Sequence, residues 1–151
     1  MKILIAFIFF AICYSLSAND INPNYDKQLA DSLGADEYGM KMYYLVILKT
    51  GPNNIEDKTK RDSVFRGHLA NISRLAEEGK LIVAGPLAKN EMQYRGIFIL
   101  NAKSKEEVQK LLETDPAIKE KVFETDIFGW YGSAALPEYL KFHKKIEKSK
   151  P

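Results

Sequence analysis

Four segments of the chain have the apolar content and local pattern of β-strands: residues 41–49, 81–84, 94–101 and 122–131. Residues 41–49 (KMYYLVILK) and 94–101 (YRGIFILN) are apolar on both of their period-two faces. A strand with one solvated face normally alternates between apolar and polar side chains. We therefore expect both faces of these two strands to be covered.

The clearest helix pattern spans residues 62–79, between the first and second predicted strands. Its apolar side chains recur at three- and four-residue spacing and form one stripe: Val64, Phe65, Leu69, Ile72, Leu75 and Ala76. Asp62 is predicted to cap the start of this helix, and Gly79 to follow its end.

A second helix is predicted over residues 105–113, between the third and fourth strands. Ser104 has the position of its N-cap, and Glu107 completes a capping box. Asp115-Pro116 then predicts a further short turn of helix, because Asp is a favoured cap and Pro a favoured first residue.

The predicted order is β-α-β-β-α-β, the order of the ferredoxin-like split unit, an α+β fold. Two helices cover one face of that sheet and leave the other face exposed. A large exposed face of aliphatic and aromatic side chains usually marks a partner surface. We therefore expect a homodimer in which the sheet faces of two copies pack together around a two-fold axis.

Composition and charge narrow the class of protein. The 151 residues are 46% hydrophobic and 28% charged, which predicts one globular domain with a sizeable core rather than disorder. The 22 basic and 20 acidic side chains leave a formal charge of +2. The chain therefore lacks the concentrated basic footprint of a protein that binds nucleic acid.

Residues 1–18 have the pattern of a signal peptide. Lys2 supplies a short positive region, residues 3–13 form an apolar run, and small residues follow. Cleavage after Ser17 and cleavage after Ala18 both fit the pattern. The apolar run is shorter than the roughly 20 residues of a membrane-spanning helix. We expect export to a bacterial periplasm or beyond, with no stable membrane anchor.

Cys13 is the only cysteine and lies in this leader, so the processed chain is expected to have no disulfide or thiol nucleophile. A flexible linker is predicted at residues 19–38, the domain at 39–133 and a basic tail at 134–151. The tail has five Lys against two Glu and the pattern of a short amphipathic helix. We interpret it as a solvated helix, with a membrane-surface or nucleic-acid role as the alternative.

His68 and Asp115 are the candidate catalytic residues. His68 follows Val64 by one turn, so it projects from the apolar stripe towards the sheet, where an imidazole needs a hydrogen-bond partner. A structural histidine and a catalytic base both fit this position. Asp115 is either only a helix cap, or also the carboxylate that orients the imidazole and raises its basicity. His143 lies in the basic tail and is interpreted as a surface residue.

Five short motifs follow one another in an informative order: Gly67-His68-Leu69, Glu78-Gly79-Lys80-Leu81, Ala84-Gly85-Pro86, Asp115-Pro116 and Val122-Phe123. Together they resemble the YCII-related (YciI-like) family over about residues 43–130. The resemblance implies a ferredoxin-like fold assembled as a dimeric α/β barrel, and a His–Asp active site at His68 and Asp115. One related enzyme class removes chloride from a chlorinated hydroxyquinol, and muconolactone isomerases share the barrel. The leader, the basic tail and Ala117, where an aromatic residue often follows Asp-Pro, differ from typical members.

Three hypotheses about function follow. The first is a cofactor-free acid–base enzyme, of lyase or isomerase type, acting on a small cyclic or aromatic compound. The second is a module that binds a small molecule without turnover. The third is a structural dimer in which His68 and Asp115 only satisfy each other. The chain has no Gly-rich phosphate loop, HExxH pair or serine elbow, so we expect no metal or cofactor.

Overall fold

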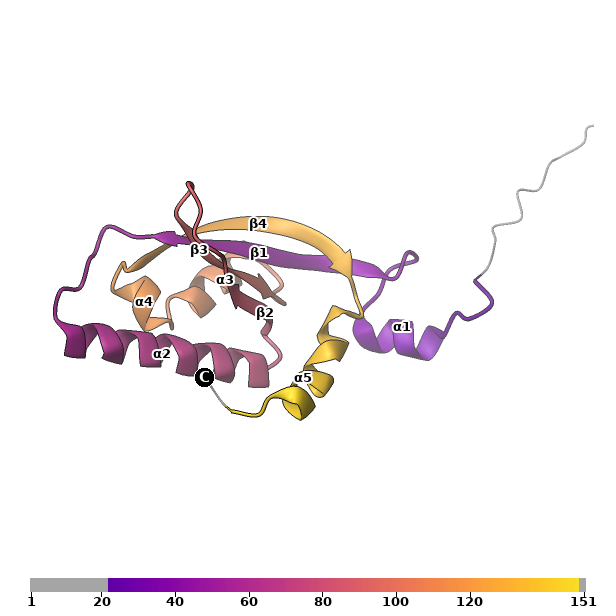
Figure 1. Ribbon diagram of the computed structural model, residues 1–151. Coiled ribbons are helices and arrows are strands. Elements are labelled where there is room, and N and C mark those ends of the chain that lie inside the picture. Colours follow the sequence, from indigo (N-terminus) through magenta and orange to yellow (C-terminus); the bar gives the residue numbers. More distant parts are fainter. Residues whose placement is uncertain (1–21, 150–151) are drawn as a thin grey trace, which may run out of the picture.

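The computed structural model describes residues 22–149 and contains a four-stranded sheet with helices packed on it (Figure 1). The strands lie in the order β2-β3-β1-β4, and each neighbouring pair is antiparallel. Their bounds are Met40–Thr50 (β1), Leu81–Pro86 (β2), Tyr94–Leu100 (β3) and Phe123–Ser133 (β4). One helix follows β1 and others follow β3, so the predicted ferredoxin-like α+β order is confirmed.

Three helices lie on one side of the sheet: α2 (Lys58–Glu77), α3 (Lys105–Leu112) and the short α4 (Pro116–Lys119) (Figure 1). The main core fills the space between them and the sheet. Strands contribute every second side chain to this core, as their pleat requires. The buried members are Val46, Leu48, Ile55, Val64, Leu75, Leu81, Phe98, Leu100, Val108, Leu112, Ala117 and Phe123.

The opposite face of the sheet carries the second apolar set that the sequence predicted for the central strands. Tyr43, Ile82 and Ile99 are buried there, with Leu136 and Leu140 of the C-terminal segment packed against them. This segment consists of a 3-10 turn, η1 (Leu136–Tyr139), and α5 (Leu140–Ile146).

Part of that opposite face stays open in the single chain. Leu45 and Ile47 of β1 are only half-buried, and Phe128 of β4 is 53% exposed. Leu45 pairs with Phe128, and paired residues of antiparallel strands share one face. These side chains therefore form an apolar surface, and its burial by a second copy remains a prediction.

The start of α2 differs from the prediction. The helix begins at Lys58, and the N-cap is Asp57, whose carboxylate accepts a hydrogen bond from the Lys60 N–H at 2.6 Å. Asp62 instead pairs with Lys58 at 2.6 Å. The first turn is polar, so the apolar stripe could not reveal it. Gly79 follows the helix with a φ of +67°, as predicted for a residue at that position.

The start of α3 follows the prediction in part. The Ser104 hydroxyl accepts a hydrogen bond from the Glu107 N–H at 3.2 Å, which makes Ser104 the N-cap. The Glu107 carboxylate, however, accepts from the Lys103 N–H rather than from Ser104. The same carboxylate pairs with Lys80 at 2.6 Å, which lowers the pKa of Glu107 below its usual value. The Glu107 carboxylate therefore bonds to Lys103 and Lys80 instead of to the Ser104 N–H.

A helix occurs within the segment expected to be a flexible linker. α1 (Lys27–Leu33) is capped by Asp26, whose carboxylate accepts from the Leu29 N–H at 2.9 Å. It ends at Gly34 in the left-handed conformation. None of its residues is buried. Leu29, Ala30 and Leu33 have helical spacing, but a pattern over only seven residues is too short to distinguish a helix from a loop.

Asp36 ties the segment after α1 to the sheet. Its carboxylate accepts hydrogen bonds from the Met40 N–H at 2.9 Å and from the Tyr131 hydroxyl of β4. The acceptor beside the phenol raises the pKa of Tyr131 to about 12. The same bond lowers the pKa of Asp36.

The leader predicted at residues 1–18, including Cys13, lies outside the described residues. Within residues 22–149, no helix is both long enough and apolar enough to cross a membrane.

Candidate functional site

His68 projects from the middle of α2 towards the sheet and is buried. Three phenylalanine rings surround its imidazole. Phe98 of β3 is stacked on it at a centroid distance of 6.0 Å, and Phe123 of β4 meets it edge-on at 5.4 Å. Phe65, on the same helix, lies edge-on at 6.5 Å and is partly exposed. The imidazole therefore has an apolar, aromatic environment.

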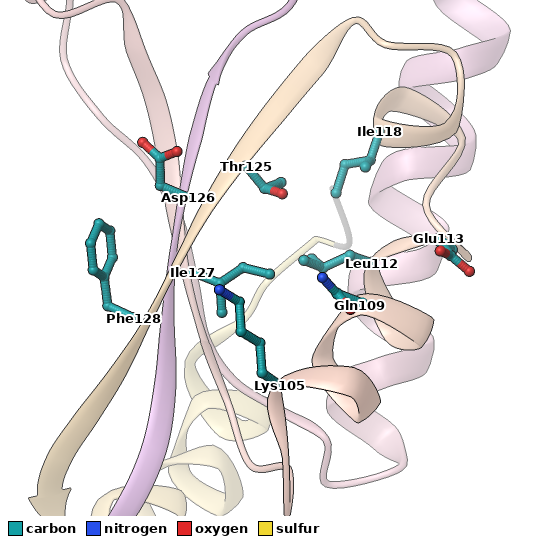
Figure 2. Close-up of a pocket in the computed structure, with 9 residues that line it drawn as sticks. All are labelled: Lys105, Gln109, Leu112, Glu113, Ile118, Thr125, Asp126, Ile127 and Phe128. Atoms are coloured by element: carbon teal, nitrogen blue, oxygen red, sulfur yellow. The ribbon is translucent and has the colours of Figure 1, made fainter.

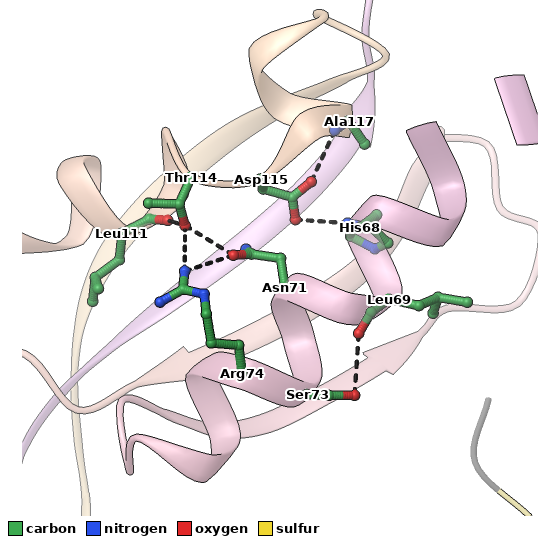
Figure 3. A network of polar contacts seen from close by, with 9 residues as sticks. All are labelled: His68, Leu69, Asn71, Ser73, Arg74, Leu111, Thr114, Asp115 and Ala117. Carbon is green, nitrogen blue, oxygen red and sulfur yellow. Dashed lines mark hydrogen bonds and ion pairs between the residues drawn. The ribbon is translucent and has the colours of Figure 1, made fainter. Parts of the chain in front are cut away.

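Asp115 lies at the start of α4 and is 1% exposed. One carboxylate oxygen, Oδ1, accepts a hydrogen bond from the Ala117 N–H at 2.9 Å. The other, Oδ2, lies 2.6 Å from Nδ1 of His68 (Figure 3). Asp115 is therefore both a helix cap, through Oδ1, and the partner of His68, through Oδ2.

This contact joins two residues that are far apart in the chain, and Gly67 makes it sterically feasible. A Cβ atom added at Gly67 would lie 2.8 Å from Cγ of Pro116, the first residue of α4. Only a glycine lets α2 and α4 approach this closely without displacement. The approach brings Asp115 within reach of His68 on the next position of α2.

A second polar cluster holds the residue before Asp115. One guanidinium nitrogen of Arg74 donates to Asn71 Oδ1 at 2.7 Å and to Thr114 Oγ1 at 2.9 Å (Figure 3). The Thr114 hydroxyl donates to the Leu111 carbonyl at 2.6 Å. These bonds fix the connection between α3 and α4 against α2, and so restrict the position of the Asp115 carboxylate.

The geometry defines which nitrogen of His68 can react. An ionised carboxylate only accepts hydrogen bonds, so the proton shared with Asp115 belongs to Nδ1. In the neutral imidazole Nε2 then carries a lone pair. Nε2 has no hydrogen-bond partner among the described residues. Every fully buried side-chain nitrogen or oxygen of those residues does have a partner, so Nε2 is not one of the fully buried atoms. Nε2 is therefore not fully enclosed by the protein, and the imidazole side chain keeps 10% of its surface exposed.

The clearest hollow of the surface lies elsewhere. It has a volume of about 610 Å³ and lies between α3 and the outer strand β4 (Figure 2). Asp126 and Phe128 point away from the helices there, whereas Thr125 and Ile127 point towards them. A second hollow lies between α2 and α4, where Val64, Gly67 and Pro116 are among the residues that line it. Neither hollow is lined by His68 or Asp115.

The remaining candidates do not join the pair. His143 is exposed on α5, as expected for a surface residue. Among residues 22–149, no three His, Cys, Asp or Glu side chains are placed to hold a metal ion together. The three phenylalanines and Gly67 were not predicted as site residues. The sequence signals were the helix stripe for Phe65 and the motifs Gly67-His68-Leu69 and Val122-Phe123 for Gly67 and Phe123.

The fold and this pair define a ferredoxin-like domain with a buried His–Asp contact. Residues 42–130 match the YCII-related domain, and the chain belongs to that family. Among solved structures, the chain is similar to 5-chloro-2-hydroxyhydroquinone dehydrochlorinase from Burkholderia phenoliruptrix, in complex with 2,5-dihydroxybenzoquinone. The identity is 26%, the match covers 58% of this chain and 92% of that one, and the TM-score is 0.44. No curated protein matches the chain.

Proposed function

We propose that the protein is a cofactor-free acid–base enzyme, of lyase or isomerase type, in which His68 and Asp115 act as a pair. The observation that carries the proposal is the 2.6 Å contact at Nδ1, which leaves Nε2 as the reactive nitrogen. Nε2 takes a proton from the substrate and later returns it. Asp115 holds the Nδ1 proton, keeps the ring in one orientation and stabilises the imidazolium that forms.

The surroundings of His68 support a small cyclic or aromatic substrate. Phe65 is partly exposed and offers an aromatic surface beside His68, whereas Phe98 and Phe123 are buried and keep the imidazole in an apolar environment. The attraction between an ionised intermediate and the imidazolium beside it is stronger in such a water-poor site than in bulk water. Membership of the YCII-related family supports the pair as the active site, because the resemblance of the motifs implies that role for both residues.

The proposed enzyme is exported and works as a homodimer. Export rests on the leader pattern of residues 1–18. The dimer rests on the open apolar surface around Leu45, Ile47 and Phe128, which a second copy would cover. Such a dimer would bury on the order of 800 Å² on each partner.

A second candidate function is a module that binds a small ligand without turnover. The observation that favours it is the hollow of about 610 Å³ between α3 and β4, which neither His68 nor Asp115 lines. A ligand held in that hollow meets neither residue of the pair, so no proton is transferred.

Proton exchange separates these candidates even when the reaction product is unidentified. A panel of cyclic ketones, lactones and hydroxyquinones is incubated with the protein in heavy water, and deuterium incorporation is followed by mass spectrometry. The enzyme hypothesis predicts that deuterium is incorporated into at least one compound. It also predicts that His68→Gln and Asp115→Asn each abolish this incorporation. Compounds that raise the melting temperature but never exchange would favour the binding module. Exchange that is equal in wild type and His68→Gln would contradict the proposed role of His68.

A further inference from the structure

The C-terminal segment lies outside the YCII-related domain and has two apolar sides. Its inner side is docked on the sheet, since Leu136 and Leu140 pack against the buried cluster around Tyr43. The Tyr139 hydroxyl donates a hydrogen bond to the Ile82 carbonyl of β2. The segment is therefore held on the domain by its own contacts.

The outer side of α5 is also apolar, and nothing in the described chain covers it. Phe142 is 58% exposed and Ile146 is 79% exposed. Successive residues of a helix are rotated by roughly 100° about its axis. Phe142 and Ile146, two and six residues after Leu140, therefore point away from Leu140 and towards one common side. A helix that only packs on its own domain needs no apolar side chains on its outward side.

Lysines lie beside this outward apolar pair, although Lys144, four residues after Leu140, is on the inner side of the helix. Lys141, Lys144 and Lys145 belong to α5 and are exposed, and Lys148 follows it. The ammonium groups of Lys141 and Lys145 lie 5.8 and 5.9 Å from the centre of the Phe142 ring. Lys141 also pairs with Glu138. The surface formed by Phe142, Ile146, Lys141, Lys145 and Lys148 is called the α5 surface.

The charge of the α5 surface restricts what can cover it. A second copy of the chain would bring its own lysines against these, and lysines are depleted at the centres of protein interfaces. A nucleic acid would pair with the lysines but would leave the apolar side chains without partners. An anionic lipid surface accepts both, because its headgroups attract lysines and its acyl region accepts Phe and Ile.

We propose that the α5 surface docks the domain reversibly on a membrane that contains anionic phospholipid. Phe142 and Ile146 enter the boundary between headgroups and acyl chains, while the lysines lie among the phosphates. A single short helix with few inserted side chains gives reversible rather than permanent attachment. This agrees with the expectation of no stable membrane anchor.

The test is co-sedimentation of the full chain, recovered from its host, with two kinds of vesicle. One is pure phosphatidylcholine, and the other contains equal parts of phosphatidylcholine and phosphatidylglycerol. We expect binding at least roughly tenfold stronger to the anionic vesicles, and weaker binding as salt is added. Phe142→Ser/Ile146→Ser and Lys145→Gln/Lys148→Gln should each remove most of this preference.

A matched control carries the same kinds of substitution on another exposed region, Lys89→Gln/Met92→Ser in the loop between β2 and β3. It should bind anionic vesicles like the wild type. All variants keep Leu136 and Leu140, and equal melting temperatures establish that they are folded. This comparison separates a specific surface from a general loss of charge and hydrophobicity.

Three results would overturn the proposal. The first is equal binding to both vesicle types. The second is binding that depends on the lysines but not on Phe142 and Ile146, which would indicate a polyanion such as nucleic acid. The third is a change in oligomeric state of the Phe142→Ser/Ile146→Ser variant, seen by light scattering, without loss of vesicle binding. That last result would assign the α5 surface to contact between copies.

Discussion

Gly67→Ala is the substitution that tests most sharply why α2 and α4 lie so close together. The added Cβ would lie 2.8 Å from the Pro116 ring, whereas ordinary contacts begin near 3.4 Å. Either α4 or the ring must retreat by at least about 0.6 Å, because a proline ring has little freedom to turn aside. Asp115 precedes Pro116 directly, so the retreat lengthens its contact with His68.

The expected sign of the stability change is the informative quantity. In a helix without close neighbours, replacing Gly by Ala stabilises by about 1 kcal/mol through helix propensity alone. Overpacking a close contact costs about 1–3 kcal/mol, and the buried His–Asp contact also weakens. We therefore expect Gly67→Ala to destabilise the protein by ~1–2 kcal/mol net.

Urea denaturation of four proteins measures this effect: wild type, Gly67→Ala, Pro116→Ala and the double variant. Without the proline Cγ, the nearest remaining atom is Cβ at 3.5 Å, so Gly67→Ala should become stabilising in the Pro116→Ala background. Ala70→Gly, at an exposed position of α2, serves as the control for propensity alone. A gain of about 1 kcal/mol for Gly67→Ala in the wild-type background would refute the close-approach argument.

Three further outcomes are expected. Asp115→Ala removes a helix cap and leaves the His68 Nδ1–H without its partner. The free energy of unfolding, measured by urea titration, should therefore fall by about 2–4 kcal/mol. A loss below about 0.5 kcal/mol would contradict the buried contact. The bond to Asp36 raises the pKa of Tyr131 above its ordinary value of 10.0, to about 12, so this phenol stabilises the fold below pH 10 and loses that effect as pH rises towards 12. The difference in urea midpoint between wild type and Tyr131→Phe should therefore vanish over that range, and a difference that stays constant would count against the bond. Phe128→Asp places a charge on the open sheet surface. Light scattering should therefore show that the variant dimer dissociates at concentrations at least roughly tenfold higher than the wild-type dimer. A wild type that is monomeric at micromolar concentration would contradict the proposed dimer.

Local signals in the sequence were sufficient for much of the fold. Gly79, Ser104 and Asp115-Pro116 mark helix ends through short-range hydrogen bonds and backbone preferences, and the structure has those ends where they predict. The two-faced pattern of the central strands likewise corresponds to two buried clusters on opposite faces of the sheet. Such features depend on neighbours within a few residues, or on a period that the sequence displays directly.

Features that depend on tertiary contacts were harder to predict. α1 is only seven residues long and the first turn of α2 is polar, so neither shows an extended apolar stripe. The Glu107 carboxylate was expected to accept from the Ser104 N–H, but it accepts from the Lys103 N–H and from Lys80, which lies 27 residues away. The contact between His68 and Asp115 spans 47 residues and depends on the fit of Gly67 against Pro116. Spacing alone could suggest both residues but could not establish their distance.

The central claim is that Asp115 holds the proton on Nδ1 of His68 and leaves Nε2 free to exchange protons. Nitrogen NMR of His68 in ¹⁵N-labelled protein measures this directly, because protonated and unprotonated ring nitrogens have distinct chemical shifts. In the neutral form the account predicts a proton on Nδ1 and a lone pair on Nε2, and Asp115→Asn should disturb that assignment. A neutral imidazole in the wild type with its proton on Nε2 would contradict the account.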